Sequence, residues 1–165
     1  MKAKLLRLFV PMALVFTMIS CTKSASDEAA VDKTLITKYD YSQDELQLAQ
    51  LINEYRTSKG LNTLEIVNHI SYKSGEHNTY MIDNNVVNHD YFDERAENII
   101  EVLGATKVGE NIAYNFVSSS SVLNAWLNSP GHKANIEGDY THFGISITVS
   151  PTTGKKYYTN MFMKK

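Results

Sequence analysis

The spacing of apolar side chains predicts that the chain after residue 40 begins with helices. In the first of these stretches, one helix face would carry Leu48, Leu51, Ile52 and Tyr55. Ser42 and Glu45 precede this face with the spacing of a capping box, and Gly60 follows it as a natural stop. The same kind of pattern predicts three further helices, at residues 70–83, 92–103 and 121–128.

The end of the chain alternates between apolar and polar residues, which is typical of strands. The segments "HFGISITVS" and "KYYTNMFMK" alternate in this way, and the turn sequence "PTTGK" joins them. An earlier segment, "KVGENIAYN", is also predicted to be extended. Because helices come first and a hairpin comes last, the order predicts an α+β fold with helices packed on a small antiparallel sheet.

The first twenty residues differ from the rest and resemble a lipoprotein signal peptide. Three basic residues precede the apolar run "LFVPMALVFTMIS", which is too short for a lasting transmembrane span. The only cysteine of the chain, Cys21, follows at once, and "MISC" resembles a bacterial lipobox with Met18 where leucine is usual. We expect Cys21 to receive lipid such as palmitate. The alternative is a plain secretory signal followed by an unrelated cysteine.

This interpretation divides the chain into three parts and places it in the bacterial cell envelope. Residues 1–20 form the signal peptide, residues 21–40 the lipidated cysteine with a flexible tether, and residues 41–165 the folded domain. Two or more acyl chains would hold the protein firmly on a membrane. The acidic pair in "SASDE" resembles a sorting signal and favours the outer membrane. The net charge of −2 gives no reason to expect a nucleic-acid partner.

The stretch "NSPGHKANI" predicts a histidine in the first turn of a short helix. Ser129 is the expected N-cap, Pro130 the first helical residue and His132 the third. The partial positive charge at a helix start disfavours imidazolium. We therefore expect His132 to be neutral and able to bind a metal or accept a proton. The alternative is a surface histidine in a turn.

Five motifs follow one another along the chain: "LINEYR", "NHDYFDERAENI", "GENIA", "AWLNSPGHKANI" and "FGISI". Together they resemble the CAP superfamily of cysteine-rich secretory, antigen 5 and pathogenesis-related proteins, in its bacterial SCP-like branch, over about residues 42–163. The resemblance implies an α-β-α sandwich with a small three-stranded antiparallel sheet whose third strand lies near residues 107–114. It also implies a large cleft lined by two histidines and acidic residues, where several members bind zinc or another divalent ion.

Matched motif by motif, the resemblance places His89, Glu110 and His132 in this cleft. It makes His89 and His132 the candidate metal ligands. The place of the family's second acidic residue is taken by Ser129, so the set of four cleft residues is incomplete. Asn111, which follows Glu110 directly, is a further candidate cleft residue and is expected to support the loop through its side-chain amide.

Two kinds of role remain open for Glu110. With two neutral imidazoles it can complete a zinc site that keeps one position open for water, or it can act as the catalytic base of a hydrolase. It can instead orient one of the histidines or accept bonds from backbone N–H groups. A further histidine, His77, is expected to pack on the second helix rather than to bind a ligand.

Familiar catalytic patterns are not found elsewhere in the sequence. The only cysteine is the predicted lipid site, and no G-x-S-x-G, P-loop or dinucleotide-binding motif occurs. We therefore expect an envelope-anchored module whose cleft binds a lipid, a glycan or a peptide. A zinc-dependent hydrolase of peptide or cell-wall material is the first alternative, and a structural envelope protein with a vestigial cleft is the second.

Overall fold

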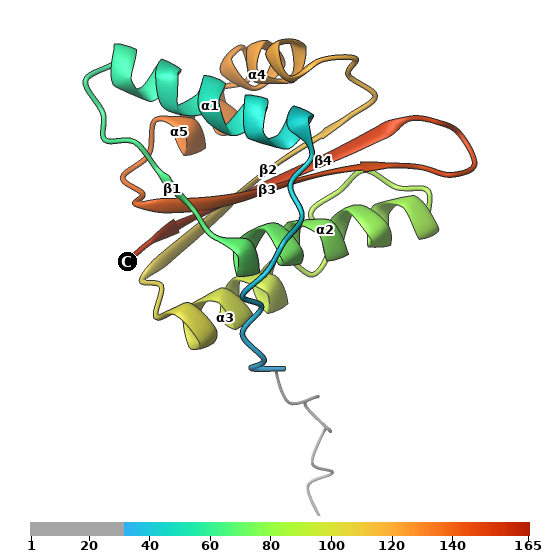
Figure 1. The fold of residues 1–165 in the computed structure, drawn as a ribbon, viewed down its shortest axis with the longest axis horizontal. Helices are drawn as coiled ribbons and strands as arrows, with labels where there is room; N and C mark the ends of the chain where they lie inside the picture. The colour runs from blue at the N-terminus through green and yellow to red at the C-terminus, as the bar shows by residue number, and fades with distance from the viewer. Residues whose placement is uncertain (1–31) are drawn as a thin grey trace, which may run out of the picture. The chain divides into compact units, whose positions relative to one another are not determined.

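The computed structural model describes residues 32–165, which fold around one sheet (Figure 1). The predicted signal peptide and Cys21 lie outside the described residues. The helices are α1 (Gln43–Ser58), α2 (Asn68–Asp83), α3 (Phe92–Leu103), α4 (Ser119–Leu127) and α5 (Pro130–Ile136). The strands are β1 (Glu65–Ile66), β2 (Lys107–Tyr114), β3 (His142–Val149) and β4 (Lys156–Lys164). None of the helices in this part of the chain is long and apolar enough to cross a membrane.

The sheet has four strands in the order β1-β3-β4-β2. The hairpin strands β3 and β4 are antiparallel, as predicted, and β2 pairs antiparallel with the other side of β4. The expected three-stranded antiparallel sheet is wrong in one respect, because β1 adds a fourth strand that runs parallel to β3. With only two residues, β1 is too short to show an alternating pattern in the sequence.

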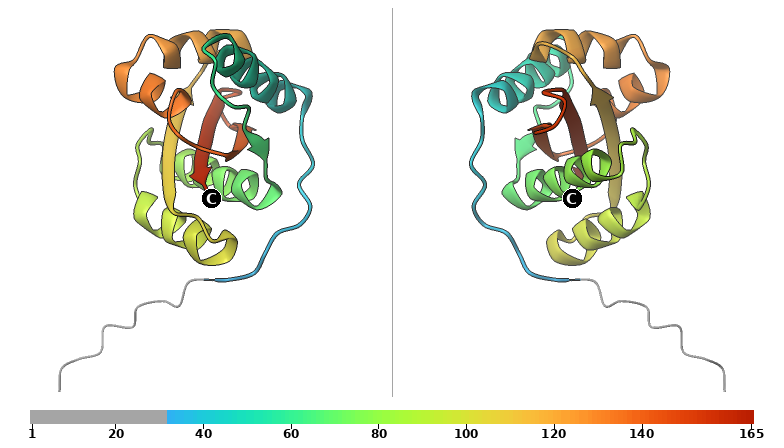
Figure 2. Two further views of the ribbon diagram at one scale, coloured as in Figure 1. Left: turned by 90° about the vertical axis from the view of Figure 1, so that its left-hand side faces the viewer. Right: turned by 90° about the vertical axis from the view of Figure 1, so that its right-hand side faces the viewer.

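Helices cover both faces of the sheet, which confirms the predicted α-β-α arrangement (Figure 2). Helices α1, α4 and α5 pack on one face through a large core that includes Ile52, Trp126 and Phe162. Helices α2 and α3 pack on the other face through a smaller core that includes Ile70 and Met161. Strand β4 lies between its two neighbours and contributes to both cores, as alternating side chains of a strand must.

The capping box predicted at the start of α1 is confirmed and has a second function. The Glu45 carboxylate accepts bonds from the Ser42 backbone N–H at 2.7 Å and from the Ser42 hydroxyl at 2.8 Å. It also accepts the backbone N–H of Ile147 in β3 at 2.8 Å. A local helix signal therefore also fastens α1 to the sheet.

Residues 32–40 belong to the predicted flexible tether, yet they are hydrogen-bonded to the domain. The segment is extended and runs past α2 towards α1 (Figure 1). The Ile36 N–H donates to His69 Nδ1 at 3.2 Å, and the Tyr39 hydroxyl donates to the Glu45 carboxylate at 2.9 Å. The folded unit therefore includes chain N-terminal to residue 41.

Helix α2 lies directly against the backbone of β3 at Gly144. A Cβ atom at Gly144 would collide with the backbone nitrogen of Ser71. This contact involves backbone atoms, so no side-chain rotation can relieve it. The close approach also allows the Ser71 hydroxyl to accept the Ile145 N–H at 3.1 Å. Glycine at this position therefore sets the distance between one helical layer and the sheet.

Gly144→Ala should destabilise the fold strongly, because α2 must move away from β3. We expect a loss of about 3 kcal/mol or more in the free energy of unfolding, measured by urea denaturation. Gly131→Ala is the matched control, since a Cβ at Gly131 meets nothing within 4 Å, and it should change stability by less than about 1 kcal/mol. Equal stability of the two variants would contradict the close approach.

Candidate functional site

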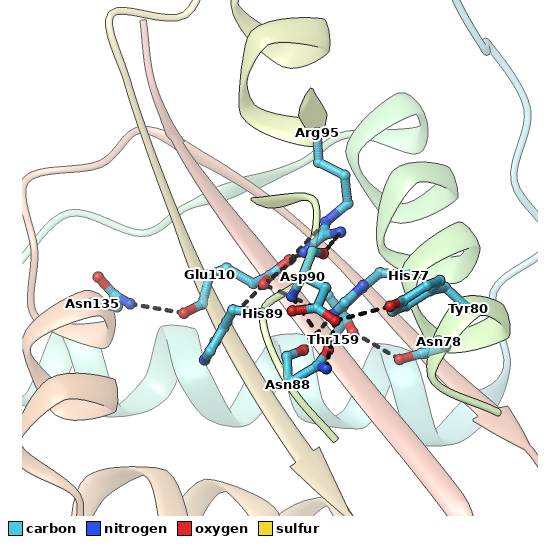
Figure 3. Close-up of polar contacts among 10 residues, drawn as sticks. All are labelled: His77, Asn78, Tyr80, Asn88, His89, Asp90, Arg95, Glu110, Asn135 and Thr159. Atoms are coloured by element: carbon cyan, nitrogen blue, oxygen red, sulfur yellow. Dashed lines mark hydrogen bonds and ion pairs between the residues drawn. The ribbon is translucent and has the colours of Figure 1, made fainter. Parts of the chain in front are cut away.

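A buried carboxylate, Glu110, is the centre of the candidate site (Figure 3). Glu110 lies on β2 with its side chain towards the layer of α2 and α3, and only 1% of that side chain is exposed. Arg95 of α3 donates two hydrogen bonds to it, from Nε to Oε2 and from Nη2 to Oε1, both at 2.9 Å. Such a bidentate pair compensates a carboxylate for the loss of water.

His89 receives its orientation from the same carboxylate. It lies in the loop between α2 and α3, and its Nδ1 is 2.7 Å from Glu110 Oε1. Because an ionised carboxylate only accepts, Nδ1 must carry the proton in this bond. The His89 side chain is half exposed, which leaves the other ring nitrogen, Nε2, free to meet a ligand. In the neutral form of the ring, Nε2 is an acceptor.

The loop that carries His89 is fixed by local contacts. Tyr91 has a φ of 58°, in the left-handed region that an aromatic residue rarely adopts. Arg95 holds this bend from inside, because its Nη1 donates to the Asp90 carbonyl at 2.7 Å. The guanidinium of Arg95 therefore connects the buried carboxylate to the loop that presents the histidine.

Burial and charge act in opposite directions on the pKa of Glu110. Burial alone would raise it, but the hydrogen bond from His89 and the positive charge of Arg95 outweigh this effect and lower the pKa below its ordinary value. Glu110 is therefore an anion across the physiological pH range. An anion with a lowered pKa is a good orienting partner for a histidine and a poor general base.

His77 lies closer to the site than its predicted packing role implies. Its Nε2 is 2.9 Å from the Asn88 carbonyl and 3.9 Å from Glu110 Oε1. Burial lowers the pKa of His77, and the attraction of Glu110 only partly opposes this. The neutral ring supports the loop before His89 through its contact with the Asn88 carbonyl. It also stacks beside Tyr80 at a centroid distance of 6.0 Å.

Helix α5 brings His132 to the other side of β2. Pro130 and His132 occupy the predicted first and third helical positions, and Ser129 is at the N-cap, although its side chain makes no capping bond. Burial, followed by the charge of His89, lowers the pKa of His132. The expected neutral imidazole is therefore confirmed in direction, but its first cause is burial rather than the helix start.

Asn111 and Asn135 attach α5 to β2. The Asn111 amide donates to the His132 carbonyl at 3.0 Å, so it supports α5 rather than the loop that the sequence led us to expect. Asn135 donates from Nδ2 to the Glu110 carbonyl at 3.0 Å and to Asn111 Oδ1 at 2.9 Å. Asn111 is fully buried, so it positions the helix rather than facing the cleft.

Two adjacent hollows meet at His89. The first has a volume of about 350 Å³ and is lined by His89, Phe92, Val108, Gly109, Glu110 and Asn135. The second, of about 480 Å³, shares His89 and Phe92 with the first. Its remaining lining residues are Asp90, Tyr91, Asp93 and Glu94. We refer to the 350 Å³ hollow as the cleft and to Asp90, Asp93 and Glu94 as the acidic rim.

The donor set does not form a complete metal site. Within residues 32–165, no group of three or more histidine, cysteine, aspartate or glutamate side chains is arranged to hold a metal ion. Both oxygens of Glu110 already accept bonds from Arg95, and one also accepts from His89. Only the two imidazoles of His89 and His132 remain, so a metal at this position stays a prediction.

Arg95 is the principal residue of the site that the sequence motifs do not indicate. It lies in "FDERAEN" beside exposed acidic residues, where a solvent-facing role would be the ordinary expectation. A signal was present in β2, because the alternation of "KVGENIAY" places Glu110 on a buried face together with Ile112. A carboxylate in that position requires a cationic partner.

The comparison with known protein families agrees with this geometry. The profile of the CAP cysteine-rich secretory protein family matches residues 49–162. The chain belongs to the CAP family. The matched range includes His89, Glu110 and His132, together with all of α2 to α5.

Relatives of this CAP domain are found in bacteria. "Uncharacterized membrane protein YlbC" of Bacillus subtilis is 34% identical over 128 residues, which cover 73% of this chain and 34% of that protein. "Uncharacterized protein YkwD" of the same organism is 26% identical over 140 residues, 79% of this chain and 52% of that protein. The chain thus spans about a third to a half of the length of these relatives.

Solved structures give the same fold. An outer surface protein of Borrelia burgdorferi matches with a TM-score of 0.69 and 25% identity, over 78% of this chain and 97% of that one. An extracellular SCP-domain protein of Bacillus anthracis matches with a TM-score of 0.65 and 24% identity, over 78% of this chain and 45% of that one. The CAP fold predicted from the sequence is therefore confirmed.

Glu110→Gln should destabilise the CAP domain, because it leaves the buried Arg95 without a counter-charge. We expect a loss of about 3–5 kcal/mol in the free energy of unfolding at pH 7, measured by urea denaturation. Glu97→Gln is the control, because it removes a negative charge at an exposed position of α3. It should lower the free energy of unfolding by less than about 0.5 kcal/mol.

The cost of Glu110→Gln should also depend on pH. Since folding lowers the pKa of Glu110 below 4.5, its ordinary value, the stability that it contributes is complete above pH 4.5 and is lost as the pH falls through the folded value. The difference between wild type and Glu110→Gln should therefore shrink on acidification below pH 4.5. A constant difference down to about pH 2 would contradict the lowered pKa.

Proposed function

We propose that this protein is an extracytoplasmic CAP-domain protein that is anchored to the cell envelope and binds a ligand in the cleft beside His89. The observation that carries the proposal is the His89–Glu110 bond of 2.7 Å. A buried carboxylate, itself held by Arg95, orients an imidazole that lines the cleft and is half exposed. This preorganised polar group at the wall of a hollow is the usual form of a specific binding site.

The chemistry of Glu110 favours binding over hydrolysis. In the alternative, a zinc-dependent hydrolase, Glu110 would act as the base or as a third ligand. Both roles would compete with the bonds that Glu110 already accepts, which are those from Arg95 and His89 at Oε1 and the one from Arg95 at Oε2. His89 lines the cleft and can contact a ligand without any rearrangement, whereas His132 is not among the residues that line either hollow. A lipid, a glycan and a peptide remain the candidate ligand classes.

The location of the relatives supports the envelope proposal. One relative is described as a membrane protein, and the similar structures include an outer surface protein and an extracellular protein. In this chain, the "MISC" sequence ending at Cys21 supports anchoring through lipid, with the outer membrane as the proposed membrane. The rest of the chain would then present the cleft outside the cytoplasm.

Ligand binding should move the His89 imidazole. We would record ¹H–¹⁵N spectra of the histidine rings in the full chain, held in mild detergent. The probes would be a mixture of short peptides, N-acetylglucosamine oligomers and lysophospholipid. One probe class should shift the ¹⁵N resonance of His89 Nε2. His89→Ala should weaken the binding of that probe at least tenfold.

Val117→Ala is the matched control for His89→Ala, because Val117 is 87% exposed and outside the lining of both hollows. It should leave the affinity unchanged. The proposal fails if no probe class moves the His89 ring at millimolar concentration, or if binding survives His89→Ala unchanged. Turnover of a peptide or cell-wall substrate that is lost in His89→Ala would instead support the hydrolase.

The proposed lipid anchor can be tested at the single cysteine. Cys21→Ser should move the protein from the membrane fraction to the soluble fraction and abolish incorporation of radiolabelled palmitate. A conservative change in the tether, Ser24→Ala, should alter neither result. A Cys21→Ser protein that remains in the membrane fraction would rule out lipid on this residue as the anchor.

A further inference from the structure

Strand β2 forms one edge of the sheet, next to β4. Its backbone N–H and C=O groups point towards β4 at one residue and away from β4 at the next. The Asn115 N–H donates to the Lys156 carbonyl at 2.7 Å, and these residues continue the β2–β4 register. In an antiparallel pair, every second residue directs both backbone groups at its partner strand. Residues 107, 109, 111 and 113 therefore bond to β4, whereas residues 108, 110, 112 and 114 direct their backbone groups away from the sheet.

Side chains from the layer of α4 and α5 occupy part of this outer edge. Trp126 Nε1 donates to the Ile112 carbonyl at 2.8 Å, and Asn135 Nδ2 donates to the Glu110 carbonyl at 3.0 Å. Each donor takes the place that a backbone N–H of an additional strand would fill. The outward geometry that the register implies is thus confirmed independently at two residues.

Val108 is the next residue in this outward series, and it lies in the wall of the cleft. Its N–H and C=O point away from β4 and have no partner among residues 32–165. The following residue, Gly109, brings bare backbone to the cleft wall, where a Cβ would lie 2.5 Å from the Tyr140 hydroxyl. The cleft therefore exposes main-chain donors and acceptors beside the oriented imidazole of His89.

The opposite edge of the sheet is closed. The outward N–H groups of Ile145 and Ile147 in β3 donate to the Ser71 hydroxyl and to the Glu45 carboxylate. Strand β1 covers the beginning of β3. Of the two sheet edges, the β2 edge thus retains backbone groups without a partner among residues 32–165 at Val108, in the wall of the cleft.

We propose that the ligand of this cleft is an extended peptide segment that pairs with the outer edge of β2 at Val108. This inference rests on the proposed function and specifies the ligand class. A peptide in β conformation offers N–H and C=O groups at the spacing that Val108 requires, whereas the sugar ring of a glycan and the chain of a lipid do not. Alternate side chains of the peptide would point towards α3 and towards α5.

The charge of the surrounding surface specifies the peptide further. The hollow next to the cleft carries the acidic rim of Asp90, Asp93 and Glu94, and it shares His89 and Phe92 with the cleft. A side chain that points towards α3 from the paired peptide would meet this rim. We therefore expect a lysine or arginine at that position of the peptide, with its aliphatic part against Phe92.

The test uses a defined probe, the capped heptapeptide Thr-Val-Thr-Lys-Thr-Val-Thr with a fluorescent label, and the full chain in mild detergent. Two further peptides carry backbone N-methyl groups, one at the odd positions and one at the even positions. Fluorescence anisotropy should show binding of the parent peptide. One N-methylated peptide should bind at least tenfold more weakly, and the other within threefold of the parent, because only alternate N–H groups face β2.

Variants of the protein provide the reciprocal test. Val108→Pro removes the outward N–H without removing a bond of the sheet and should weaken binding at least tenfold. Val117→Ala, at an 87% exposed residue outside the lining of both hollows, leaves the β2 edge unchanged and should stay within threefold. Replacing the lysine of the peptide by glutamate should weaken binding at least threefold. If Val108→Pro fails to fold, as judged by circular dichroism, the two N-methylated peptides still decide the question.

The outcomes separate this inference from the proposed function. Edge pairing is overturned if the parent peptide does not bind, or if both N-methylated peptides bind as the parent does. If a glycan or lipid probe shifts His89 while the peptide fails, the cleft binds a ligand but not by strand pairing. If no probe, including the peptide, shifts His89 or depends on it, the proposed function fails as well.

Discussion

The buried negative charge of Glu110 is the constraint on which the arrangement of the site depends. A carboxylate with 1% exposure must be compensated by charge and by hydrogen bonds. Arg95 supplies the charge, so α3 has to approach β2, and the same guanidinium holds the loop at Asp90. His89 completes the set and is thereby turned towards the cleft. One charge on an edge strand thus determines the position of a helix, a loop and an imidazole.

The cleft lies where both helical layers reach the edge of the sheet. The layer of α2 and α3 contributes Arg95 and the loop with His89, and the layer of α4 and α5 contributes Asn135 (Figure 3). Asn135 joins the second layer to β2 through backbone and side-chain acceptors. Because the two walls are fastened to the same strand by different contacts, the polar groups of the cleft are held at a fixed spacing.

The sequence predicted what depends on local spacing, and it missed what depends on distant pairing. The capping box at Ser42 and the hairpin strands follow from neighbouring residues, and the family motifs located His89 and Glu110. Strand β1 was missed because its two residues become a strand only beside β3, far along the chain. Arg95 was missed because its burial depends on Glu110, fifteen residues later. In both cases the deciding partner is invisible to a local pattern.

The two edges of the sheet differ in how far their backbone hydrogen-bonding groups are covered, and this difference bears on self-association. An exposed strand edge is a template on which other chains can aggregate, and most proteins block it. Here the edge at β3 is blocked by Ser71 and Glu45, while the edge at β2 reaches the wall of the cleft at Val108. The Ile112 and Glu110 carbonyls of β2 already accept bonds from Trp126 and Asn135, so a neighbouring sheet could not pair along the whole strand. The fold therefore shortens the stretch of strand edge that is open to self-association.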